Sequence, residues 1–143
     1  MLLNVPKILS GDLLKALCDM GHGDEVVIAD ANFPAETCGR RVVRCPGISG
    51  VEMVAAVLDV MPLDHLEGAP ALLMAVAEGD GCGEPAIWAK YGRVLEDVGR
   101  RREEVGFLER GGFYDRARRA YAVVQTGEEA LYGNIILRKG VVR

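Results

Sequence analysis

The chain has 143 residues, of which 50% are apolar and 27% charged, a composition typical of one globular domain with a sizeable core. Its formal net charge of -4 argues against a nucleic-acid or anionic-membrane surface, which would need a basic footprint. No stretch approaches the roughly 20 apolar residues of a membrane span, and Lys7 interrupts the apolar start of the chain. Because no secretory signal is visible, we expect the protein in the cytoplasm.

In the first half of the chain, helical and strand patterns alternate. Ser10 is suited to cap a helix that runs through Leu17, and Gly21 is expected to stop this helix in a left-handed conformation. Short buried strands are predicted over residues 25–30 and 40–45.

A capping box introduces the next helix. Ser49 and Glu52 have the required spacing before the apolar segment 50–61, and Pro62 ends it. Residues 70–80 are apolar until Glu78 and predict a central strand.

The second half continues the alternation. We predict a long amphipathic helix over residues 84–105, a short strand over 106–110 and a short helix over 111–120. Residues 121–142 then form two β segments around a turn. Strands separated by helices indicate an α/β fold, here a single-domain three-layer sandwich over residues 1–143. Its sheet is expected to be mixed but mostly parallel, with helices on both faces.

His22 is one of only two histidines and lies between Gly21 and Gly23. A dinucleotide-binding fingerprint is excluded because the order here is helix, GHG, strand, the reverse of what that motif requires. An imidazole titrates near neutral pH and can both donate and accept a proton, so His22 is a candidate acid/base. The alternative is a turn histidine whose ring lies in water.

Further polar candidates stand at other predicted strand ends. Asp30 follows the strand after His22, although an Asx turn explains it equally well. Arg110 precedes two glycines and could instead form a surface ion pair with Glu109 or Asp115. The run Tyr132, Gly133 and Asn134 offers a hydroxyl, a bare backbone and an amide to a polyhydroxylated ligand. Its alternative is a hairpin corner with Gly133 at positive φ.

The sequence lacks the other common catalytic signatures. No serine lies in a GxSxG pattern. The four cysteines form no CxxC pair and no metal-ligand spacing with the histidines, so we expect reduced thiols and no metal or other cofactor. The residues themselves therefore leave two possibilities, a cofactor-free acid/base site or a site that only binds a sugar-sized ligand.

Several motifs in order resemble the fucose mutarotase and ribose pyranase family over nearly the whole chain. They are "LLKALCDMGHGDEVVIADANFPA", "AVAEGD" and "RGGFYDRARRAYAVVQTGEEALYGNIILRKGV". The resemblance implies that His22 is the general acid/base and that Asp30 binds the substrate. It also implies substrate-binding roles for Arg110, Tyr132, Gly133 and Asn134.

The same resemblance implies a function without a cofactor. Arg110 and the "FYDRA" stretch are similar to the L-fucose branch, whereas the ribose branch tends to carry histidine at the position of Arg110. Asn32 and Glu36 depart from that branch, whose members have histidines there. The expected function is L-fucose mutarotation. The alternatives are a D-ribose pyranase and a monosaccharide-binding protein without catalysis. Bacterial members assemble as rings, often decamers, with the site at a subunit boundary, which implies a homo-oligomer here.

Overall fold

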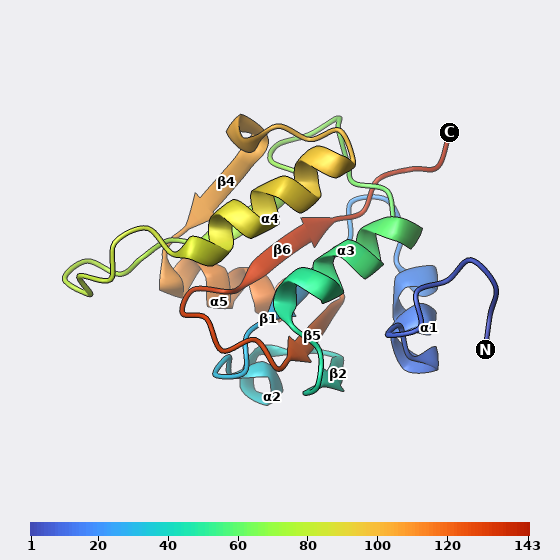
Figure 1. Ribbon diagram of the computed structural model, residues 1–143, viewed down its shortest axis with the longest axis horizontal. Coiled ribbons are helices and arrows are strands. Elements are labelled where there is room, and N and C mark those ends of the chain that lie inside the picture. Colours follow the sequence, from blue (N-terminus) through green and yellow to red (C-terminus); the bar gives the residue numbers. More distant parts are fainter.

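The computed structural model describes all 143 residues, and a six-stranded sheet forms its centre (Figure 1). The strand order is β2-β5-β1-β6-β3-β4. β6 is antiparallel to both of its neighbours, β1 and β3, and the other adjacent pairs are parallel. The strands are β1 (Glu25–Ala29), β2 (Val42–Cys45), β3 (Ala71–Met74), β4 (Val105–Leu108), β5 (Ala122–Thr126) and β6 (Ile135–Arg138).

Helices cover both faces of this sheet, so the predicted three-layer α/β sandwich is confirmed. The helices are α1 (Gly11–Asp19), α2 (Ala35–Cys38), α3 (Gly50–Val60), α4 (Ala86–Asp97), the short 3-10 helix η1 (Arg102–Glu104) and α5 (Arg110–Arg119). None of the helices is both long and apolar enough to cross a membrane.

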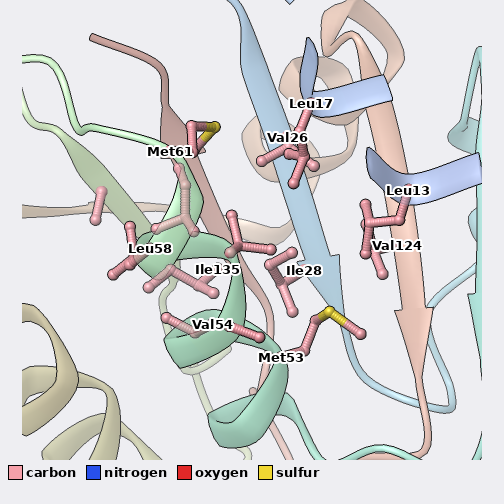
Figure 2. Packing of buried hydrophobic residues seen from close by; sticks show 14 of the residues in the cluster. Leu13, Leu17, Val26, Ile28, Met53, Val54, Leu58, Met61, Val124 and Ile135 are labelled. Atoms are coloured by element: carbon pink, nitrogen blue, oxygen red, sulfur yellow. The ribbon is translucent and has the colours of Figure 1, made fainter. Parts of the chain in front are cut away.

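Side chains of β1 alternate between two apolar clusters, as the two-residue period of a strand requires. Val26 and Ile28 join the larger cluster, in which α1, α3 and α4 pack on the sheet. Figure 2 shows Leu13 and Leu17 of α1 on one side of these residues, and the side chains of α3 on the other. Val27 and Ala29 face the smaller cluster, to which α2 and α5 contribute. β1 is therefore buried on both faces and forms a fixed support for the residues at its two ends.

The structure corrects the predicted ending of α1. Gly21 is not left-handed; the positive φ of 85° belongs to Gly23. Lys139 explains the difference, because its Nζ donates to the carbonyls of Leu17 and Met20, at 2.7 and 2.5 Å. A lysine from the end of β6 thus satisfies carbonyls that a glycine cap would otherwise serve.

Two predicted segments are shorter than expected. The central-strand pattern over 70–80 gives only β3, second from the sheet edge, which ends at Met74 level with Leu108, the last residue of β4. In the loop that follows, Gly79, Gly81 and Gly83 adopt positive φ. The long helix ends at Asp97, two residues before Gly99, whose φ is 81°. Positive φ at these glycines is incompatible with continued strand or helix.

The last two β segments do not pair with each other. β5 and β6 are separated by β1, so residues 127–134 cross the end of β1 instead of forming a hairpin turn. The N–H of Ala31 donates to the carbonyl of Glu128 at 2.8 Å during this crossing. Residues 127–134 are thereby placed beside the segment that follows β1.

The predicted capping box is present at the start of α3. Ser49 Oγ accepts from the N–H of Glu52, and a carboxylate oxygen of Glu52 accepts from the N–H of Ser49 at 3.1 Å. Replacing Ser49 by Ala should lower the free energy of unfolding by about 1 kcal/mol, because it removes the capping oxygen. Urea denaturation checks this, with Ser49→Asp as the control that keeps an oxygen at the cap. Equal losses in both variants would contradict a capping role.

Candidate functional site

Most of the predicted site residues gather at one edge of the sheet. The carboxyl ends of β1, β3 and β4 lie at this edge together with the amino end of β6, because β6 runs in the opposite direction. Loops at the carboxyl ends of parallel strands are the usual place for ligands in α/β sheets. Here they form a hollow with a volume of about 150 Å³, lined by Asp30, Asn32, Phe33, Met74, Asp80, Arg110, Tyr114, Leu131, Tyr132 and Asn134.

Asp30 and Asn134 form a reciprocal pair at the base of this hollow. The N–H of Asp30 donates to Asn134 Oδ1, and Asn134 Nδ2 donates to Asp30 Oδ2, both at 2.8 Å. The Asx turn considered for Asp30 also exists, because Oδ1 accepts from the N–H of Asn32 at 3.0 Å. Asp30 is only 6% exposed, and burial raises the pKa of its carboxyl group. Asp30 can therefore form the Asx turn and still face a ligand in the hollow.

Tyr132 adopts the left-handed conformation, with φ of 57°, which is uncommon for a residue other than glycine. Its hydroxyl donates to the carboxylate of Asp80 and accepts from the N–H of Ala77 at 3.2 Å. The hydrogen bond raises the pKa of Tyr132 and lowers the pKa of Asp80. Trp88 Nε1 donates to the carbonyl of Tyr132 at 3.2 Å, so the unusual backbone is held from two sides.

Gly133 contributes close packing and not a left-handed turn. A Cβ atom at this position would lie 3.0 Å from the carbonyl of Ala130 and 3.0 Å from Cγ of Glu128. The Tyr91 hydroxyl donates to the carbonyl of Gly133 at 2.7 Å. The alternative of a hairpin corner with positive φ at Gly133 is therefore wrong, since Tyr132 has that conformation and no hairpin exists.

Arg110 is the first residue of α5 and lines the hollow. It forms no ion pair with Glu109 or Asp115, the surface partners considered for it; Asp115 pairs with Arg118 instead, at 2.7 Å. The positive charge of Arg110 contributes to the lowered pKa of Asp80, after the larger effect of the Tyr132 hydroxyl. The lining of the hollow therefore includes a guanidinium, two carboxylates, two amides and two phenols.

His22 lies at the opposite edge of the sheet, in the turn before β1. β1 has five residues, which span about 16 Å at ~3.3 Å per residue. A ligand held at Asp30 is therefore out of reach of His22 in the same chain. The structure brings Asp30, Arg110, Tyr132 and Asn134 together in the hollow, and it places His22 apart from them. Gly133 lies between Tyr132 and Asn134 in the chain but does not line the hollow.

The His22 side chain is 45% exposed and its Nε2 lies 3.2 Å from Oδ1 of Asp64. Asp64 follows α3 and is 2% exposed. The N–H of Leu66 holds the pKa of Asp64 below its usual range, and His22 adds to this effect. The histidine is thus paired with a buried carboxylate, unlike a ring that lies only in water.

Sequence reasoning did not single out Asp64 or Asp80. Asp64 is distant from His22 in the chain and has no local pattern around it, so only the folded structure shows the contact. Asp80 is part of the "AVAEGD" motif, and that motif was a signal for it. No cluster of three or more histidine, cysteine or acidic side chains is arranged to hold a metal ion.

Comparison with known proteins identifies the family. A family model described as the RbsD / FucU transport protein family matches residues 3–142. The chain belongs to this family. Human fucose mutarotase is 46% identical over 96% of this chain and 92% of its own length. L-fucose mutarotase of Haemophilus influenzae strain PittGG is 43% identical over 99% of this chain and 97% of its own length.

Solved structures of this family share the fold. The crystal structure of fucose mutarotase from Streptococcus pneumoniae, in complex with L-fucose, has a TM-score of 0.94 and 44% identity, covering 99% of this chain and all of that one. Bacillus subtilis RbsD complexed with D-ribose has a TM-score of 0.70 and 23% identity, with full coverage of both chains. The second comparison shows only the common fold.

Proposed function

We propose that the protein is an L-fucose mutarotase, an isomerase that interconverts the α and β anomers of the free sugar. The observation that carries this proposal is the similarity over nearly the full length to proteins named fucose mutarotase, one of them crystallised with L-fucose. The polar hollow agrees with such a substrate, because its side chains can donate to and accept from several hydroxyls.

Mutarotation breaks and re-forms the bond between the anomeric carbon and the ring oxygen. The ring opens to the free aldehyde when a base removes the proton of the anomeric hydroxyl, the C–O bond breaks and an acid protonates the ring oxygen. After the aldehyde group rotates, the reverse steps close the ring on the other face of the carbonyl. We assign the acid/base role to His22, whose imidazole can both accept and donate. Asp30 and Arg110 would hold sugar hydroxyls by charge-assisted hydrogen bonds, and Tyr132, Gly133 and Asn134 would close the hollow.

The separation of His22 from the hollow supports a homo-oligomer. Since His22 cannot approach a sugar in its own chain's hollow, we propose that His22 of a neighbouring copy reaches it. A closed ring gives every hollow one such neighbour, which agrees with the ring assembly implied by the family resemblance. The four free cysteines agree with the cytoplasmic location that the sequence predicts.

Exchange NMR between the anomers tests the activity. We expect the protein to accelerate exchange of L-fucose more than that of D-ribose, because Arg110 occupies the position in which the ribose branch tends to have histidine. Faster exchange of ribose alone would move the assignment to a pyranase. Saturable binding without acceleration of either sugar would indicate a binding protein and contradict the proposal.

A further inference from the structure

We infer that Asp64 is the positioning residue of the acid/base group: its carboxylate holds the imidazole proton on Nε2 of His22 and leaves Nδ1 to exchange protons with the sugar. The inference rests on the proposed role of His22 and adds to it the identity of the working nitrogen. It starts from the 3.2 Å contact between Nε2 and Oδ1 of Asp64.

The surroundings of Asp64 require an ionised carboxylate. Oδ1 accepts from the N–H of Leu66 at 3.1 Å and faces His22, while Oδ2 lies 3.3 Å from Nε of Arg138. Two oxygens are therefore surrounded by an N–H donor, a guanidinium and the imidazole. A protonated carboxyl would have to direct its hydrogen at one of these groups. An ionised carboxylate can only accept, so the ring nitrogen that faces it must carry a hydrogen.

The turn that carries His22 is also fixed. The N–H of Gly23 donates to the carbonyl of Lys139 at 2.8 Å, and the N–H of Gly21 donates to the carboxylate of Asp24 at 2.8 Å. Lys139 in turn anchors the end of α1 through its side chain. The backbone on both sides of His22 is therefore held by hydrogen bonds, and Nε2 faces Asp64. The ring nitrogen that remains for a ligand is Nδ1, which makes no hydrogen bond within the chain.

The Asp64 carboxylate also keeps the ring in one orientation during the proton transfer. When Nδ1 takes the anomeric proton, the imidazole becomes a cation beside the Asp64 carboxylate, and the ring keeps its orientation throughout the transfer. A carboxylate that fixes a histidine tautomer is a known device of acid/base sites.

The first test reads the tautomer directly and does not depend on activity. The ¹⁵N spectrum of the unmodified protein, with labelled histidine, should show His22 as the Nε2–H form when the ring is neutral. His65, which is exposed, gives the reference signal. The Nδ1–H form at His22 would overturn the inference even if the protein is an active mutarotase.

The second test uses Asp64→Ala, which removes both carboxylate oxygens. Because Oδ1 is the acceptor that faces Nε2 of His22, the Nε2–H population should fall when it is removed. We expect the maximal exchange rate of L-fucose to drop about 10- to 100-fold with little change in KM, because the sugar-holding residues lie at the other edge of the sheet. A rise in KM alone, or an unchanged rate, would contradict the inference.

Glu67→Gln is the matched control. Glu67 also pairs with Arg138, at 3.4 Å, but its side chain is 77% exposed and does not contact His22. Its replacement should leave both the His22 tautomer and the exchange rate unchanged, since exposed ion pairs contribute little. Equal effects in both variants would show that only the position of Arg138 matters and would remove the role given to Asp64.

Discussion

Replacing His22 by Ala should reduce the catalysed exchange of L-fucose anomers by about 10²- to 10⁴-fold, the usual contribution of general acid/base catalysis. The fold should be retained, because the side chain is 45% exposed and belongs to neither apolar cluster. Binding of L-fucose should also persist, since the hollow contains Asp30, Arg110 and Tyr132 but not His22. Exchange NMR gives the rate, and calorimetry at equal protein concentration gives the affinity.

His65→Ala is the natural control for this experiment. His65 is the only other histidine, is exposed, and follows Asp64 directly in the chain. The His65→Ala variant should interconvert the anomers of L-fucose at the rate of the unmodified protein. A His22→Ala variant with an undiminished rate would remove the imidazole from the mechanism. A His22→Ala variant that no longer bound L-fucose would instead indicate that His22 contributes to substrate binding.

The architecture could be predicted because its signals are local. The capping box at Ser49 and Glu52 and the apolar run of β1 identify elements from neighbouring residues alone. Two of the errors arose where distant residues decide. Lys139 ends α1 in place of a glycine cap, and the insertion of β1 between β5 and β6 depends on pairings far apart in the chain.

The candidate site could also be predicted only in part. Asp30, Arg110 and Asn134 were identifiable as polar residues at predicted strand ends and as matches to family motifs, and the structure brings them together. His22 and Asp64 lie in two loops and are 42 positions apart in the chain, so no local sequence pattern could indicate their contact. The position of His22 relative to the hollow also depended on strand direction: a residue before a strand and a residue after it lie at opposite edges of the sheet.

Because His22 lies apart from the hollow of its own chain, we expect activity to recover when two inactive variants assemble together. One variant is His22→Ala, which keeps the hollow. The other combines Asp30→Asn with Arg110→Ala, which removes two of its charges but keeps His22. If each site takes its imidazole from one copy and its hollow from another, a hybrid assembly contains some sites with both parts intact. At equal amounts of randomly mixed chains, about a quarter of the sites should be complete.

The measurement is the L-fucose exchange rate of hybrids prepared by co-expression with two different affinity tags and purified through both. Assemblies of each variant alone are the controls and should remain nearly inactive. Recovery towards a quarter of the unmodified rate requires that the site is shared between copies, because neither chain contains both a usable His22 and a usable hollow. Hybrids that carry both tags yet stay inactive would mean that His22 does not serve a neighbour's hollow. Since β1 keeps His22 away from its own hollow as well, that result would leave the histidine without access to the bound sugar.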